Sequence, residues 1–294
     1  MTITIPRHNP AYKGQIAKLF NLKTNDNFLD LTLGDGGHTQ EALEVGAKVT
    51  SFDVDPESIQ RAKGFVPKEL AKNWTVINSN MTSIGDSLKA LPPVLYNGII
   101  IDLGPSQYQV LAPNRGFSFA STSNLDMRLD KTLGVTAKDL LAALGPKELE
   151  QILALADEPK AKQIAKAIVA TRKITPLETG EQLAKLVTKA KHAGFQKTHP
   201  ATQTFMALRM AVNLEREVIK DTLPQLPSLL KKGGILGIIS FHSGEDRLVK
   251  QFGKSELATQ TLSVIYKKPL KPSAEEINNN PRVRSALLRL FEKK

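Results

Sequence analysis

The stretch FLDLTLGDGGH, Phe28 to His38, together with Asp53 decides the expected fold of this chain. Its apolar first half is typical of a strand covered on both faces of a parallel sheet. The glycines after it predict a tight turn, and Thr39 to Leu43 predicts a helix whose first amides attract an anion. Val49 to Val54 predicts a second strand with Asp53 near its carboxyl end. This order is typical of an open α/β sheet that binds the ribose of an adenosine cofactor.

The glycine spacing narrows the choice of cofactor. Gly34, Gly36 and Gly37 do not complete the pattern GxGxxG, because Thr39 stands where the third glycine would be. Dinucleotide sites use that third glycine for close packing of helix on strand, so NAD and FAD are disfavoured. A single adenosine with an amino-acid tail, S-adenosylmethionine, fits better. The alternative is an α/β domain whose glycine turn has no ligand.

The bulk composition sets wide limits. A chain of 294 residues is long enough for roughly one to two domains. The net charge of +11 favours a polyanionic partner, although a basic surface without such a partner has the same composition. The absence of cysteine excludes disulfides and thiol catalysis. The sequence contains neither an apolar signal region at its N-terminus nor a run long enough to span a membrane, so a cytoplasmic protein without a membrane partner is expected.

Strands and helices alternate only in part of the chain. Helices such as Pro56 to Phe65 separate the early strands, which predicts a parallel sheet with crossover helices. From Val110 to Gln203 the apolar residues follow helical periods, and Thr179 with Gln182 is typical of a capping box. A helix is expected at about Thr204 to Leu223. The expected strands are Phe28–Leu33, Val49–Val54, Trp74–Ser79, Gly98–Leu103, Ile235–Phe241, Leu262–Lys268 and Val283–Leu290.

These patterns predict a discontinuous sheet domain with an all-helical domain inserted after its fourth strand. The expected boundaries place residues 1–109 and 204–294 in the sheet domain and residues 110–203 in the insertion. Asp102 ends the fourth strand, in IIIDLGPSQYQV, and should face the same crevice as Gly36 and Asp53, because ligands of open sheets bind beyond the carboxyl ends of the strands. There it could contact the cofactor, or accept a hydrogen bond from an exocyclic amine that is to be methylated.

Three further segments carry candidate substrate-binding residues. Arg115 and Arg128 lie with phenylalanines in an aperiodic loop, a combination suited to stacking and phosphate contact. From the residues alone, a structural loop with either arginine bridging Asp126 or Asp130 is slightly favoured. His199 and Arg209 flank the expected helix start. His242 follows the fifth strand, where Ser243 and Asp246 are typical of a capping box; metal binding by His242, Glu245 and Asp246 is disfavoured, and no metal is expected.

Six motifs occur in an order that resembles one family. They are GDGGH, DLGPSQYQ, RGFSF, LDMRLD, HPATQTFMALR and FHSGEDR, followed by NNNPRVRSALLR near the end of the chain. Together they resemble the ribosomal small subunit methyltransferase H family (MraW-like), and the resemblance covers nearly the whole sequence. It implies a Rossmann-like class I methyltransferase sheet with an inserted helical domain for recognition of RNA.

The resemblance also implies an activity and a set of contacts. The family transfers a methyl group from S-adenosylmethionine to N4 of a cytidine in the P-site (decoding) region of 16S rRNA, so the implied partner is 16S rRNA or the small ribosomal subunit. A homodimer is also compatible with the sequence. Asp102 is the expected catalytic residue. By matching positions, the implied cofactor contacts are Gly36, Gly37, His38, Asp53, Met81, Asp102 and Gln109.

Some positions depart from the family's pattern. DLGVSS is DLGPSQ here, with Pro105 and Gln107, and FHSLED is FHSGED, with Gly244. These departures concern the loops around the expected cytidine more than the cofactor residues. They leave open a methyltransferase for another nucleic acid or a small molecule, and a diverged module that binds cofactor or RNA without turnover.

Overall fold

The computed structural model describes residues 5, 7–191 and 198–294, which form two compact units. The sheet unit comprises Arg7–Ser106 and Arg216–Lys294, and the helical unit comprises residues 107–215 with Ile5. The chain therefore leaves the sheet after its fourth strand and returns before the fifth. The sequence had placed the end of the insertion at residue 203, whereas the structure keeps the following helix, α10 (Thr202–Val212), in the helical unit.

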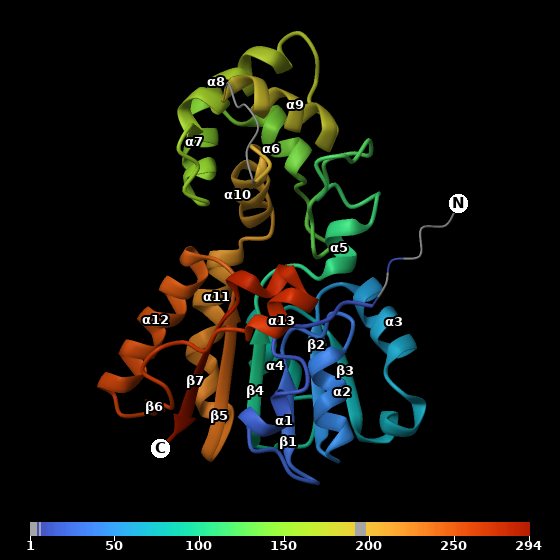
Figure 1. Ribbon diagram of the computed structural model, residues 1–294, viewed down its shortest axis with the longest axis vertical. Coiled ribbons are helices and arrows are strands. Elements are labelled where there is room, and N and C mark those ends of the chain that lie inside the picture. Colours follow the sequence, from blue (N-terminus) through green and yellow to red (C-terminus); the bar gives the residue numbers. More distant parts are fainter. Residues whose placement is uncertain (1–4, 6, 192–197) are drawn as a thin grey trace. The chain divides into compact units, whose positions relative to one another are not determined.

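The sheet unit is built on seven strands in the order β3-β2-β1-β4-β5-β7-β6 (Figure 1). Strands β1 to β5 pair in parallel, and β7 pairs antiparallel with both β5 and β6. This is an open Rossmann-like α/β sheet, as the sequence predicts. The strands are β1 (Asn27–Asp30), β2 (Lys48–Asp53), β3 (Trp74–Asn78), β4 (Tyr96–Asp102), β5 (Leu230–Ser240), β6 (Leu262–Val264) and β7 (Leu287–Lys293).

Both faces of the sheet are buried, because successive side chains of a strand point to opposite sides. In β4, Ile99 and Ile101 join one apolar cluster and Ile100 joins another. The first cluster receives residues of α4, α11, η3 and α12, and the second those of α1 and α2. The helices here are α1 (Ile16–Leu19), α2 (Gly37–Glu44), α3 (Pro56–Phe65), α4 (Ile84–Leu88), α11 (Glu215–Thr222), α12 (Ser243–Ala258) and α13 (Ala274–Asn279), with 3-10 turns η1 (Lys68–Asn73), η2 (Met81–Ser83), η3 (Leu223–Leu229) and η4 (Pro281–Ser285).

The helical unit has its own core. Its helices are α5 (Gln107–Leu111), α6 (Ala137–Ala143), α7 (Pro146–Ala154), α8 (Ala161–Arg172), α9 (Gly180–Ala190) and α10. Leu149 and Leu153 of α7 pack with Ile164 and Ile168 of α8 at helical spacing. Thr179 caps α9 in the expected capping box with Gln182. Within the described part of residues 110–203 the only strand-like pairing is an isolated bridge between Asn124 and Thr179.

Two expected strands differ from the structure. The last strand was placed at 283–290, but Pro281 begins the 3-10 turn η4 and β7 starts only at Leu287. Val283 is buried in that turn, so its apolar character reflects a core contact and no strand. The sixth strand ends at Val264 instead of Lys268; it pairs only with β7 at the edge of the sheet, where short strands are usual.

The long helix expected at 204–223 is two helices. It breaks where Asn213 ends α10 and Leu214 adopts a positive φ of 50°. The Asn213 side chain accepts a hydrogen bond from Leu129 N and donates to Met127 O. These long-range hydrogen bonds of Asn213 end the helix where the chain passes from one unit to the other. A periodic sequence pattern contains no sign of them.

Candidate functional site

The glycine turn after β1 uses its glycines for different purposes. Gly34 and Gly36 have positive φ values of 52° and 77°. A Cβ on Gly34 would meet only the Ser106 Cβ at 3.8 Å, so the space beside it is open to a ligand. Gly37 is the first residue of α2, and a Cβ there would lie 2.6 Å from the Pro10 ring. The sequence assigned Gly37 to ligand approach, whereas in the structure its missing side chain admits Pro10.

An ion pair fixes this turn from outside. Asp35 is 3% exposed, and its carboxylate accepts two hydrogen bonds from Arg61 of α3, at 2.8 and 2.9 Å. The same carboxylate accepts the His8 N–H at 2.8 Å. Phe65 lies under both Arg61 and Arg7, whose guanidinium carbons are 5.2 and 5.3 Å from the ring centroid. Arg7 in turn donates to the carbonyls of the turn itself. The turn is therefore held by a charged network before any ligand binds.

Asp53 ends β2 beside the turn. Its Oδ2 accepts the Gly34 N–H at 2.9 Å, and its Oδ1 accepts the Asp55 N–H at 2.9 Å. Burial raises the pKa of the Asp53 carboxyl to about 7, against the opposing effect of the two backbone hydrogen bonds. A carboxylate offers about four lone-pair sites. Each oxygen of Asp53 therefore keeps acceptor capacity for a ligand's hydroxyl groups.

A second acidic group ends β4, next to the same turn. Asp102 Oδ2 lies 3.5 Å from Nε2 of His38, which is 3% exposed on α2. Burial lowers the His38 pKa, but the facing carboxylates Asp102 and Asp30 outweigh it, so the His38 pKa is raised above its ordinary value. Asp30 is fully buried and holds the turn through the Thr32 N–H and the Thr39 hydroxyl. The imidazole thus stands between two carboxyl groups at the ends of β1 and β4.

This cluster contains buried polar atoms that lack a hydrogen-bond partner within the described part of the chain. They are Nδ1 of His38 and Oδ1 of Asp102, while Nε2 of His38 has the long 3.5 Å contact with Oδ2 of Asp102 and no shorter one. Buried polar atoms are normally satisfied, and those at a functional site await a ligand or water. The neighbouring strand ends of β2, β1 and β4 therefore combine an open glycine turn, carboxylates with remaining acceptor capacity and unsatisfied donors. That donor and acceptor set suits the hydroxyls and the amino-acid tail of an adenosine cofactor.

The other two expected cofactor residues are placed differently. Met81 is the first residue of η2 after β3, and it is partly buried against the apolar cluster under the sheet. Its position beyond a strand end next to β2 is compatible with a contact to the adenine of a cofactor whose ribose Asp53 binds. Gln109 is 4% exposed on α5, in the helical unit. The described geometry of the sheet unit therefore contains every expected cofactor residue except Gln109.

The arginines of the expected RNA loop are turned inward. Arg115 is 2% exposed and donates to the carbonyls of Arg128 and Leu129. Arg128 makes a bidentate ion pair with Asp126, at 2.7 and 2.8 Å, and also donates to the carbonyl of Leu133. These contacts favour the structural loop that the sequence left open over a direct phosphate contact.

The remaining expected substrate residues also have internal partners. Arg209 pairs with Glu215 through two hydrogen bonds of 2.7 and 2.9 Å. His199 is exposed and stacks on Phe119, with ring centroids 4.4 Å apart, while its Nδ1 accepts the Ala201 N–H.

At the start of α12 the capping residue differs from the expected one. His242 is the N-cap, its Nδ1 accepts from Gly244 N, and Glu245 completes the capping box. Ser243 and Asp246 had been expected in these roles, one residue further along. Asp246 instead accepts two hydrogen bonds from Arg289 of β7. A histidine can cap because its unprotonated ring nitrogen is an acceptor.

Sequence reasoning missed Asp30, Asp35 and Arg61. Asp30 had a usable signal, because an acid inside the apolar run FLDL must be buried and must therefore have partners. Asp35 and Arg61 had no usable sequence signal. They are 26 residues apart, and nothing in the sequence singles out Arg61 among the arginines as the partner of Asp35.

Known proteins resemble this chain over nearly its whole length. Residues 6–294 match the model of the MraW methylase family. The chain belongs to that family. A relative named ribosomal RNA small subunit methyltransferase H, from Coprothermobacter proteolyticus, is 39% identical, with 97% of this chain and 96% of the relative covered. Relatives with the same name from Pseudothermotoga lettingae and Syntrophotalea carbinolica are 39% and 35% identical, covering 98% and 100% of this chain and 99% and 100% of their own lengths.

Family membership confirms the resemblance recognised from the motifs, and with it a methyltransferase that uses S-adenosylmethionine. No helix among the described residues is long and apolar enough to cross a membrane.

Proposed function

We propose that this MraW-family methylase transfers a methyl group from S-adenosylmethionine to N4 of a cytidine in the decoding region of 16S rRNA. The observation that carries the proposal is one open turn at Gly34 that is surrounded by the strand-end carboxyl groups of Asp53 and Asp102 and by His38 of α2. The names of the relatives support a ribosomal RNA of the small subunit as substrate. The cytidine and its N4 atom rest on the motif resemblance.

Each cofactor residue has a proposed part. Asp53 accepts the ribose hydroxyls, and Met81 contacts the adenine. Gly36, Gly37 and the first turn of α2 hold the amino-acid end, and His38 offers a ring nitrogen to the same end. For Gln109 a cofactor contact stays a prediction from the motif resemblance alone. When bound, S-adenosylmethionine supplies an electrophilic methyl group on its sulfonium.

Asp102 is the proposed catalytic residue. The N4 amine of cytosine is a poor nucleophile because its lone pair is conjugated into the ring. Oδ1 of Asp102 has no hydrogen-bond partner in the described part of the chain, so it can accept an N–H of the amine, turn it out of the ring plane and aim its lone pair. Nε2 of His38 lies 3.5 Å from the other oxygen, Oδ2, and helps to hold the carboxylate in place for this task. The N4 proton is released to water after transfer.

The test is methylation of 16S rRNA and of small subunits from a strain that lacks the native enzyme, with the product mapped by mass spectrometry. N4-methylcytidine at one decoding-region position is expected. Asp102→Ala should lower kcat/KM for the RNA by about 100-fold or more, the usual effect of removing one preorganised polar contact at the reacting group. Asp86→Ala is the matched control, because Asp86 is an exposed acid paired only with Lys89. Active, cofactor-bound protein that forms no N4-methylcytidine would sink the proposal.

A further inference from the structure

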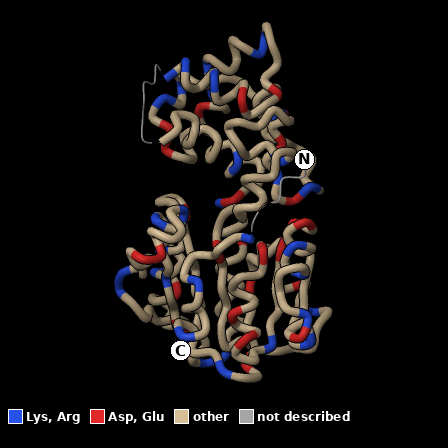
Figure 2. Tube along the Cα trace, turned by 45° about the vertical axis from the view of Figure 1, so that its right-hand side comes forward, with Lys and Arg blue, Asp and Glu red and all other residues tan. Residues whose placement is uncertain are grey.

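The outward positive charge of the helical unit is carried by lysines. Residues 107–215 contain 15 Lys and Arg against 10 Asp and Glu. The arginines expected to touch RNA are engaged internally: Arg115 with carbonyls, Arg128 with Asp126, and Arg209 with Glu215. Figure 2 shows Lys and Arg recurring along the helices of this unit. A polyanion that binds here must therefore use side chains other than those three.

One helix presents these lysines as a stripe. Lys162 and Lys166 are one turn apart on α8, and Lys173 follows at its C-terminal end on the same face. All three are exposed, and none has an ion pair with a described residue. The sequence from Pro159 to Leu177 contains no acidic residue at all. No acid within this stretch opposes the lysines, so the acids that face them come from α7.

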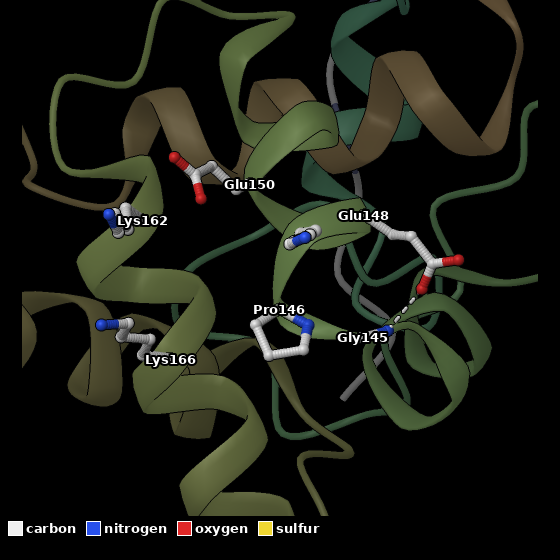
Figure 3. A pocket seen from close by; sticks show the side chains of 7 residues that line it. Gly145, Pro146, Glu148, Glu150, Lys162 and Lys166 are labelled. Carbon is white, nitrogen blue, oxygen red and sulfur yellow. Dashed lines mark hydrogen bonds between the residues drawn. The ribbon is translucent and has the colours of Figure 1, made fainter.

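The stripe borders a groove between α7 and α8. The groove has a volume of about 710 Å³ and is lined by Gly145, Pro146, Lys147, Glu148, Glu150, Lys162 and Lys166. Figure 3 shows Lys162 and Lys166 on one side of it, with Pro146 facing them from the start of α7. Glu148 turns away and accepts the Gly145 N–H at 2.6 Å, which leaves Glu150 as the one other acid of the lining.

We propose that the α7–α8 groove, with Lys147, Lys162 and Lys166, is a docking surface for the phosphate backbone of the RNA substrate. Charge complementarity carries this assignment: the lining holds three lysines against two glutamates, and Glu148 turns its carboxylate to the Gly145 N–H, away from Lys162 and Lys166. Lysine binds phosphate as a mobile point charge without reading bases, so the surface adds affinity and not sequence choice. The inference rests on the proposed function for the identity of the RNA.

The salt dependence of binding measures these contacts directly. Each phosphate neutralised changes the slope of log K against log salt by about 0.7 for single strands and about 0.9 for duplex. The double variant Lys162→Gln with Lys166→Gln should therefore flatten the slope by roughly 1.4 to 1.8 and weaken binding roughly 10-fold at physiological salt. Glutamine has a helix propensity close to that of lysine, so α8 should remain folded.

The experiment uses the full chain and a fluorescently labelled 16S rRNA transcript, with affinity measured by anisotropy from 50 to 200 mM salt. The matched control is Lys68→Gln with Lys72→Gln, two exposed lysines at the same spacing in η1 of the sheet unit. Thermal melting and calorimetric titration with S-adenosylhomocysteine check that both variants keep their fold and cofactor site.

A flatter slope for the α8 variant alone, with a raised KM and unchanged kcat in methyl transfer, supports the proposal. Equal losses in both variants, or a slope equal to that of the wild type, overturn it. The proposed function fails separately: if the wild-type protein binds the transcript but forms no N4-methylcytidine in transcript or subunit, the reaction is wrong, while the salt slopes still decide whether the groove binds RNA.

Discussion

The titration of Asp53 leads to a pH-dependent affinity for the cofactor. Burial raises the pKa of this carboxyl to about 7, and both of its oxygens already accept backbone N–H groups. Ribose hydroxyls need acceptors, and a protonated carboxyl has one fewer. The ionised form should therefore bind S-adenosylmethionine, so that affinity rises with pH through about 7 and binding near pH 7 releases protons.

The magnitude follows from linkage. With a pKa of about 7, the carboxyl is about nine-tenths ionised at pH 8 and about one-tenth ionised at pH 6. If only the ionised form binds, the dissociation constant should be about 10-fold larger at pH 6 than at pH 8, equivalent to about 1.4 kcal/mol. The raised pKa of Asp53 affects the stability of the cofactor-free protein in the opposite direction: stability falls as pH rises, whereas affinity for the cofactor increases. The folded pKa lies above the unfolded one, so this contribution to stability is present at low pH and is lost as pH rises through 7.

Calorimetry with S-adenosylhomocysteine between pH 6 and 8 measures the effect, and repetition in buffers of different ionisation enthalpy counts the protons released. Asp53→Asn is the matched control, because it keeps the shape and one acceptor but does not titrate. Its affinity should be lower than that of the wild type at pH 8 and nearly flat with pH. His38 is present in both proteins, so the difference between their pH profiles reports Asp53. Parallel pH profiles for wild type and variant would refute the assignment of the ionised Asp53 to the ribose.

Two further changes test how the glycine turn is held. Arg61→Met leaves the buried carboxylate of Asp35 without its bidentate partner, and the usual cost of breaking such a pair is about 3–5 kcal/mol. Chemical denaturation should therefore show a clear loss of stability, and calorimetry should show a weaker affinity for the cofactor. Wild-type stability and affinity in this variant would contradict the role of the pair. Gly37→Ala places a methyl group 2.6 Å from the Pro10 ring and should cost about 1–3 kcal/mol. Gly64→Ala in α3 is its control, because nothing lies within 4 Å of a Cβ there, and it should be neutral or stabilising; equal effects of the two alanines would exclude the contact.

The parts of the fold that the sequence predicts well are those decided by local patterns. The strand starts near Phe28, Val49 and Trp74 and the bounds of α3 follow from apolar runs, a proline and a capping aspartate. The errors occur where a distant contact overrides the local pattern. Asn213 ends α10 because its side-chain amide donates to Met127 O and accepts from Leu129 N, and the chain there crosses between the two units.

The candidate site divides in the same way. Gly34, Asp53 and Asp102 could be predicted because strand ends of a parallel sheet converge whatever the other residues are. His38 required the family resemblance, since a histidine within a helix has no periodic signature of its own. The ion pair of Asp35 with Arg61 could not be predicted. Asp35 lies in the turn before α2 and Arg61 lies in α3, and no spacing rule links these two positions.

The inward arginines have a physical reason that applies beyond this loop. A guanidinium has five N–H donors in a fixed fork, so a single Arg can satisfy several carbonyl groups and a carboxylate inside an aperiodic segment. Arg128 does this with Asp126 and two carbonyls. An ammonium on a flexible stem is strongly hydrated and gains less from such a position, so lysines such as Lys162 and Lys166 stay at the surface. In a basic insertion of this kind, lysines at helical spacing with no acidic neighbour are therefore better candidates for phosphate contact than arginines in a loop rich in carbonyls and aspartates.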